Sequence, residues 1–184
     1  AVLALSQACA PSVAPETLAA IAHVESRFDP LAIGVNRGGR RPPPARDAAD
    51  AARMARSLLA TGANLDLGLA QINSSNLTWL GLTVEQAFDP CRNLAAAGVV
   101  LRAGYRLAEG VDRQTTLRVA LSRYNTGHPE RGFRNGYVAR VEAAAATLGV
   151  LPLAPVRPVA DDRSAPPVPT QPPAAWDVFG RAQA

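Results

Sequence analysis

Half of the 16 prolines of this chain lie in residues 150–184, and this uneven distribution limits which part of the sequence can fold. Proline fixes the backbone angle φ and donates no backbone hydrogen bond, and such a stretch cannot bury enough apolar surface to offset the entropy of ordering. Residues 1–149 instead carry apolar residues at helical spacing. The sequence therefore predicts one folded domain over residues 1–149 and a flexible, disordered Pro-rich tail over residues 150–184.

The folded part is expected to be predominantly α-helical. The chain is 48% hydrophobic but only 5% aromatic, with many alanines, which suits close-packed helices better than a large sheet. Asp89 followed by Pro90 is a strong helix-start signal. We expect helices over residues 2–9, 15–27, 47–60, 91–110, 115–124 and 137–148, and at most a small irregular hairpin within residues 34–46.

Glu25 is a carboxylate on the apolar face of the second expected helix. It follows Ile21 by four residues and Ala22 by three, so it shares their face. Burial against apolar neighbours raises the pKa of a carboxyl group, and a carboxyl that stays protonated near neutral pH can give a proton to a leaving oxygen. The helix pattern alone leaves open that Glu25 caps a loop or pairs with an arginine.

The net charge of +4 suits an anionic partner such as nucleic acid, anionic lipid or a cell-wall polymer. No run of basic residues is long enough, or contains enough aromatic residues, to form a nucleic-acid site, so we expect no nucleic-acid partner. No stretch approaches the about 18 consecutive apolar residues of a membrane span, so no transmembrane segment is expected. The chain lacks an initiator Met, and we expect a mature form whose targeting segment is missing from view.

The chain has two cysteines, Cys9 and Cys91, and their state is open at this point. They are either free thiols of a cytosolic protein or one disulfide in an oxidising compartment, worth about 4 kcal/mol in the chain-entropy model. The absence of a Cys-x-x-Cys pair and the presence of only two His argue against a zinc site. We expect no metal and no cofactor.

Three polar clusters interrupt the helical segments, and a single tyrosine follows them. They are His23-Val24-Glu25-Ser26, Gly68-Leu69-Ala70-Gln71-Ile72-Asn73 and Ser122-Arg123-Tyr124-Asn125, with Tyr137 beyond the third. Each alone has an ordinary explanation, because amides beside apolar residues usually hydrogen-bond turns and a Tyr at a helix end usually packs in the core. Their order along the chain is more specific than any one of them.

In this order the clusters resemble the motifs of the lysozyme-like, SLT-domain lytic transglycosylases. The chain is most similar to the periplasmic transglycosylase subunit of type IV secretion and conjugation systems. That family carries Glu-Ser, Gly-Leu-x-Gln and Ala-Tyr-Asn motifs, and Arg123 replaces the small residue of the third. The resemblance spans about residues 9–149. It implies a lysozyme-like α+β fold, a periplasmic location and pairing of the two cysteines.

The resemblance also implies a role for each site residue. Glu25 is the catalytic acid and base, and Tyr137 orients its carboxyl group. The remaining residues contact the peptidoglycan glycan strand, by hydrogen bonds or, for Tyr124, by a ring against a sugar face; they are Ser26, Gln71, Asn73, Tyr124 and Asn125. Further partners are expected among secretion-system proteins, through the tail.

The expected reaction needs only one protein carboxylate. Most glycosidases use two, but the motifs here supply one. The resemblance implies that the 6-hydroxyl of N-acetylmuramic acid attacks its own anomeric carbon, which yields a 1,6-anhydro product. Two alternatives stay open, namely a hydrolytic muramidase on the same fold and a peptidoglycan-binding scaffold protein without activity.

Overall fold

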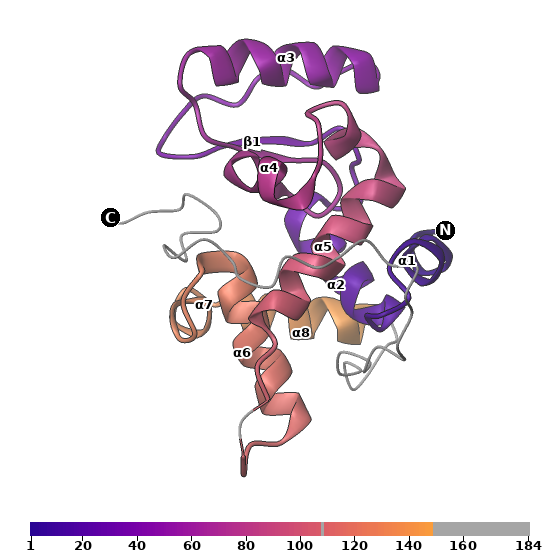
Figure 1. Ribbon diagram of the computed structural model, residues 1–184, viewed down its shortest axis with the longest axis vertical. Coiled ribbons are helices and arrows are strands. Elements are labelled where there is room, and N and C mark those ends of the chain that lie inside the picture. The colour runs from indigo at the N-terminus through magenta and orange to yellow at the C-terminus, as the bar shows by residue number, and fades with distance from the viewer. Residues whose placement is uncertain (108, 149–184) are drawn as a thin grey trace.

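A computed structural model of the chain describes residues 1–107 and 109–148, so the predicted tail over residues 150–184 lies outside the described residues. Figure 1 shows the arrangement of the elements. The α-helices are α1 (Val2–Cys9), α2 (Pro15–Ser26), α3 (Ala48–Ala60), α4 (Leu77–Leu80), α5 (Pro90–Gly104), α6 (Arg113–Thr126), α7 (Arg131–Arg134) and α8 (Tyr137–Thr147). The strands are β1 (Ile33–Val35), β2 (Leu65–Leu67) and β3 (Ile72–Asn73), and the 3-10 turns are η1 (Ser74–Asn76) and η2 (Gln86–Phe88).

The predominantly α-helical fold with a small β element is confirmed, but the pairing of the strands differs from the expected hairpin. The three strands form an antiparallel sheet in the order β1-β2-β3, with Ile33 opposite Leu67 and Asp66 opposite Asn73. Residues 36–46 form a loop rather than a second strand, because β1 finds its partner 30 residues further along the chain. Strands of two or three residues carry too little alternation to be read from the sequence.

Helix α5 runs through the middle of the molecule in Figure 1. In that view α3 lies at the top, β1 and α4 lie beside the upper part of α5, and α6, α7 and α8 lie around its lower part. Helices α1 and α2 pack beside α5, and α8 packs on α2. The core between these helices contains fully buried leucine and isoleucine side chains such as Leu18, Ile21, Leu94, Leu101 and Leu117. The molecule is thus a helical body with the small sheet at one end.

Aspartate caps fix where three helices begin. Asp47, Asp89 and Asp112 each accept a hydrogen bond from the backbone N–H three residues later, at 2.8, 2.8 and 2.9 Å. Such caps satisfy an N–H group that has no partner within the helix and stabilise it by about 1 kcal/mol each. The start of α5 agrees with the prediction from Asp89-Pro90. Its end does not, because the helix expected to reach residue 110 stops at Gly104.

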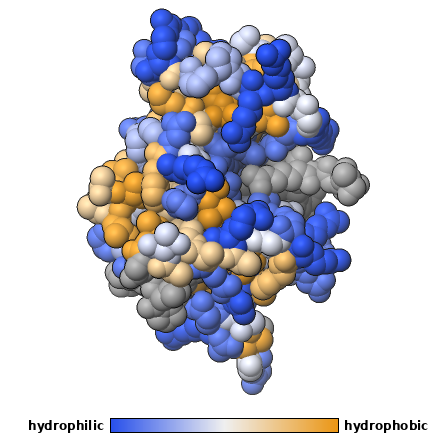
Figure 2. Space-filling view, turned by 180° about the vertical axis from the view of Figure 1, so that it is seen from behind, coloured by the Kyte–Doolittle hydropathy of each residue, from blue (hydrophilic) through white to orange (hydrophobic). Residues whose placement is uncertain are grey.

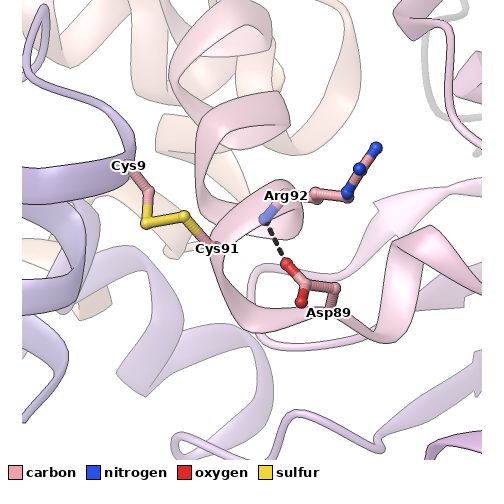
Figure 3. The surroundings of a disulfide bond; sticks show 4 residues. All are labelled: Cys9, Asp89, Cys91 and Arg92. Atoms are coloured by element: carbon pink, nitrogen blue, oxygen red, sulfur yellow. Dashed lines mark hydrogen bonds between the residues drawn. A yellow bond between two sulfur atoms is a disulfide. The ribbon is translucent and has the colours of Figure 1, made fainter.

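A disulfide joins Cys9, the last residue of α1, to Cys91 in the first turn of α5 (Figure 3). Their Cα atoms lie 5.3 Å apart, within the usual range for a disulfide. The expected pairing is therefore confirmed.

The surface of the described residues is mixed. Hydrophobic residues gather mainly across the middle of the face in Figure 2, and hydrophilic residues cover much of its upper and lower ends. Among helices within residues 1–107 and 109–148, none combines the length and the hydropathy that a membrane crossing requires.

Candidate active site

Glu25 and Ser26 are the last two residues of α2, which ends abruptly after them. The Arg27 N–H donates to the His23 carbonyl at 3.0 Å and the Phe28 N–H to the Ala22 carbonyl at 3.4 Å, so two nested backbone bonds close the last turn of the helix. Arg27 and Phe28 have φ of 56° and 69°, a left-handed region that costs non-glycine residues about 1–2 kcal/mol each. Strain of this kind is often stored at functional sites.

A cavity of about 480 Å³, called here the Glu25 cavity, opens at this helix end. It lies between the end of α2, the segment that leads into β1, and part of the loop that follows β1. Its lining residues are Val24, Glu25, Ser26, Arg27, Asp29, Leu31, Ala32, Ile33 and 41–45. Glu25 is half-buried and its Oε1 atom is excluded from solvent. The cavity therefore contains a sheltered carboxyl group beside open space for a ligand.

Asp50 holds the far wall of the Glu25 cavity in place. Its carboxylate accepts hydrogen bonds from the backbone N–H and the guanidinium of Arg46, at 3.1 and 3.2 Å. The Arg46 side chain, followed by the Arg46 backbone N–H, holds the pKa of Asp50 below its usual value. The loop of residues 36–46 is thereby attached to α3 directly after its cavity-lining residues.

The segment from Gly68 to Gln71 is held by side chains of three helices. Ser26 of α2 donates its hydroxyl to the Leu69 carbonyl at 2.7 Å, and Tyr124 of α6 donates to the Ala70 carbonyl at 2.8 Å. Asn93 of α5 accepts from the Ala70 N–H at 2.7 Å. All three sequence motifs therefore meet at one turn.

Asn93 is a site residue that the sequence analysis missed. It is fully buried, and its amide nitrogen donates to the carbonyls of Leu67 and Ala87 at 2.8 and 2.7 Å. A side chain at Gly68 would meet the Ala87 carbonyl at 2.4 Å and the Asn93 amide at 2.5 Å, and Gly68 has φ of 73°. Glycine is thus required where the chain turns against Asn93. No motif signal marks an asparagine whose partners are all backbone groups, two of them more than 20 residues away.

Replacing Asn93 by Ala is expected to lower the free energy of unfolding by about 3 kcal/mol. The change removes three buried hydrogen bonds of about 1 kcal/mol each and leaves their backbone partners unsatisfied. Urea unfolding followed by circular dichroism measures the loss. An unfolding midpoint equal to that of the wild type would contradict the organising role of Asn93.

Gln71 spans two backbone segments with its amide group. Its Nε2 atom donates to the carbonyls of Ala32 and Gly68, at 3.2 and 3.0 Å, and the residue itself has φ of 52°. A side chain at Gly34 would lie 2.8 Å from its Oε1 atom. Ala32 lines the Glu25 cavity, so Gln71 supports the cavity wall. The predicted glycan contact of Gln71 stays a prediction.

Asn73 belongs to a buried polar cluster on the sheet. It donates to Asp66 at 2.8 Å and to Asn64 at 2.7 Å, and Asn36 donates to Asp66 at 3.1 Å. Asn73 is fully buried and its Oδ1 atom accepts from Asn64 and from the Ser75 N–H. The predicted contact of Asn73 with a glycan would therefore require breaking this cluster.

Tyr124 is placed differently from the role expected of it. Its side chain is only 1% exposed, so its ring is not available to a sugar face in this conformation. Its hydroxyl group instead donates to the Ala70 carbonyl. Ser26 likewise directs its hydroxyl at a backbone carbonyl. Both side chains hold the backbone of residues 69 and 70 in place, and their direct contact with substrate stays a prediction.

Asn125 and Tyr137 are linked through Asn135, a second residue that the sequence analysis did not identify. Asn135 donates to the Asn125 Oδ1 atom at 2.8 Å and accepts from the Tyr137 backbone N–H at 2.9 Å. Tyr137 is buried at the start of α8, and its hydroxyl oxygen is excluded from solvent. Asn135 thus joins the end of α6 to the start of α8. The Asn-Gly pair before the helix was the available signal.

Arg123, the departure from the family motif, points away from these residues. Its guanidinium donates to the Gly104 carbonyl at the end of α5, at 3.0 Å. A cation at a helix C-terminus interacts favourably with the helix dipole. Burial, followed by the nearby charge of Arg106, lowers the pKa of Arg123 from its ordinary value. The arginine therefore caps α5, and this helps to explain why α5 ends at Gly104.

Within residues 1–107 and 109–148, no group of three or more His, Cys, Asp or Glu side chains is arranged to hold a metal ion. The described residues thus place the Glu25 carboxyl group at a helix end beside a cavity, and next to it lies the turn of residues 68–71, which is held by side chains of three helices.

The chain that carries this site belongs to the transglycosylase SLT domain family, whose sequence profile matches residues 3–146. The resemblance seen in the motifs is therefore confirmed, and with it the lysozyme-like α+β fold class. Protein virB1 of Rhizobium radiobacter is 46% identical over 180 residues, which cover 97% of this chain and 72% of the relative.

Two further relatives carry the same protein name. Protein virB1 of Agrobacterium fabrum (strain C58) is 48% identical over 175 residues, covering 94% of this chain and 67% of the relative. The type IV secretion system protein virB1 of Brucella abortus (strain 2308) is 46% identical over 153 residues, covering 78% of this chain and 63% of the relative. No solved structure matches the chain significantly.

Proposed function

We propose that this protein is a lytic transglycosylase that cleaves the β-1,4 bond between N-acetylmuramic acid and N-acetylglucosamine and leaves a 1,6-anhydro-muramic product. The observation that carries the proposal is Glu25, a sheltered carboxyl group at the edge of a cavity in a transglycosylase-family domain. The general enzyme kind follows from the family, and the product chemistry is the proposed part.

Glu25 serves in turn as acid and as base. It first gives its proton to the glycosidic oxygen as the bond between that oxygen and the anomeric carbon breaks. The 6-hydroxyl oxygen of the same muramic acid then bonds to the anomeric carbon, and its proton passes to Glu25. No water is consumed, and the carboxyl group ends in its starting state. One residue performs both steps because the two proton transfers are sequential.

Asp29 is the acidic residue that a hydrolytic mechanism at this site would need as its second carboxylate. It is the second carboxylate among the described residues that line the Glu25 cavity. Its Oδ1 atom accepts the Leu31 N–H at 2.9 Å, so this oxygen takes part in a turn. The other nearby acid, Asp66, is held within the amide cluster of the sheet. These contacts favour a site with a single working carboxyl group.

Replacing Asp29 by Asn is expected to keep at least half of the wild-type turnover. Asn retains an oxygen that can accept the Leu31 N–H, so the turn survives while the charge is lost. Turnover on purified peptidoglycan, with products identified by mass spectrometry, measures the effect. A loss of more than about 100-fold would indicate a second catalytic carboxylate and would favour the hydrolytic muramidase.

Product identity also separates the remaining alternatives. Anhydro-muramic ends support the transglycosylase, reducing ends alone support the hydrolytic muramidase, and binding without cleavage supports the scaffold protein.

We further propose that the protein acts in the periplasm and opens the wall locally for a type IV secretion apparatus. The proposal is supported by a relative named type IV secretion system protein virB1 and by the disulfide, which suits an oxidising compartment. The division into a catalytic domain over residues 1–149 and a partner-binding tail over residues 150–184 is part of this proposal. The family match ends at residue 146, which supports that boundary.

A further inference from the structure

A second pocket lies between α2 and α8 and is called here the α2–α8 pocket. Its volume is about 290 Å³, enough for a small polar group. Its lining residues are His23, Val24, Arg27, Arg140, Ala143, Ala144 and Thr147. None of the predicted site residues lines it, so the mechanism proposed for Glu25 does not account for it.

The lining of the α2–α8 pocket is basic. It contains two arginines and one histidine, and no Asp or Glu is among its described lining residues. No ion pair within the described part of the chain neutralises Arg27 or Arg140. The nearest acid along α8 is Glu142, which faces Arg118 of α6 instead, at 2.7 Å. The pocket thus presents positive charge that suits an anionic ligand.

The pocket adjoins the Glu25 cavity. Val24 and Arg27 line both, so these two residues form a wall that the Glu25 cavity and the α2–α8 pocket share. The left-handed backbone at Arg27 sets the direction in which its side chain leaves the end of α2. On the other wall, Arg140 donates to the Asn135 carbonyl at 3.0 Å, and its guanidinium lies 5.8 Å from the centre of the Tyr137 ring. The guanidinium of Arg140 is therefore held at the edge of the site, and Arg27 lies on the wall that the two cavities share.

We propose that the α2–α8 pocket binds a carboxylate carried by the glycan strand, an inference that rests on the proposed function. Arginine presents a planar fork of donors that matches a carboxylate, and charge-assisted hydrogen bonds of this kind are strong. Peptidoglycan offers two such carboxylates, the lactyl group of a muramic acid without its peptide and the free carboxyl groups of an attached peptide. The pocket makes the enzyme prefer strands with a negative substituent beside the cleaved sugar.

Ala143 offers a test in which only charge differs. It is exposed on α8 and lines the pocket. Ala143→Glu places a carboxylate among the basic groups, and Ala143→Gln places an uncharged group of the same size. Ala143→Glu is expected to raise KM about 10-fold over Ala143→Gln on carboxylate-bearing strands, with kcat within about 2-fold, because the new carboxylate repels the bound one and competes for the arginines, at a cost of about 1.4 kcal/mol.

Measuring KM on three substrates identifies which carboxylate is bound. The first is strands that carry peptides, and the second is strands freed of their peptides by an amidase, which expose the lactyl carboxylates. The third is peptide-free strands whose lactyl carboxylates are converted to amides. A KM difference on the first alone assigns the peptide carboxylate, and a difference on the second assigns the lactyl group. Arg140→Gln should show the same pattern, while Arg113→Gln, an exposed arginine at the start of α6, removes the same charge elsewhere and should leave KM unchanged.

The proposal is overturned if Ala143→Glu and Ala143→Gln have equal KM on both carboxylate substrates, or if their difference persists on the amidated strands. Wild-type protein that forms no anhydro product from any of the three would refute the proposed function itself, a separate outcome. Melting temperatures of all variants within about 2 °C of the wild type exclude a folding effect, because the altered side chains are exposed.

Discussion

Glu25→Gln is expected to lose about 10³-fold in turnover on peptidoglycan while its binding to insoluble peptidoglycan stays within about 3-fold of the wild type. General acid and base catalysis contributes about 10²–10⁴-fold, and an amide can neither give up a proton to the leaving oxygen nor take one from the attacking hydroxyl. Gln has the size of Glu, so the Glu25 cavity keeps its shape. Anhydro-muropeptides released from purified cell walls, quantified by mass spectrometry, measure turnover.

Glu109→Gln is the matched control for this change. Glu109 is exposed in the connection between α5 and α6, far along the chain from the cavity lining, and its replacement removes the same charge. It should act at the wild-type rate. If Glu25→Gln released anhydro-muropeptides at more than a tenth of the wild-type rate, Glu25 would not be the acid and base, and the proposed mechanism would be wrong.

Removing the disulfide by changing both Cys9 and Cys91 to Ala is expected to lower the free energy of unfolding by about 4–5 kcal/mol. The bond closes a loop with a sequence separation of 82 residues, and the chain-entropy model assigns that stabilisation to a loop of this length. For a domain of this size such a loss corresponds to a fall of roughly 10–20 °C in melting temperature. Urea and thermal unfolding under non-reducing conditions measure both quantities.

Reductant provides the internal control for the disulfide. Dithiothreitol should lower the stability of the wild type towards that of the double variant and leave the double variant unchanged. If the free energies of unfolding of the disulfide-bonded wild type and the double variant differed by less than about 1 kcal/mol without reductant, the bond would not be needed to keep α1 and α5 together. The predicted sensitivity also means that the protein is suited to an oxidising compartment.

Local signals explain which elements the sequence predicted well. Asp47 and Asp89 mark helix starts because an aspartate cap bonds only to residues close in sequence. Gly127, with φ of 72°, ends α6 where the Asn-Thr-Gly run predicted it. The site motifs were also visible, because Glu-Ser and Gly-Leu-x-Gln are short runs. That these motifs meet at one turn is seen only in the folded structure, because their order along the chain does not show which of them are in contact.

Long-range partners explain what the sequence did not predict. Strand β1 pairs with a strand 30 residues away, Arg123 reaches from α6 to the end of α5, and Asn93 bonds to the backbone of Leu67 and Ala70, more than 20 residues before it. None of these contacts leaves a periodic pattern, so propensity and spacing cannot reveal them. The buried ring of Tyr124 has the same origin, because its exposure depends on how α6 packs against residues 68–71.

The turn over residues 68–71 is held through its backbone, and this separates the positions that can vary from those that cannot. Within this turn, the hydroxyl groups of Ser26 and Tyr124 donate to the backbone carbonyls of Leu69 and Ala70, and Asn93 accepts from the backbone N–H of Ala70. Every amino acid except proline offers these same atoms. Residues 69 and 70 can therefore be replaced by other apolar residues that fit their buried positions, whereas Gly68 and the three side chains on the surrounding helices cannot be replaced without losing the turn.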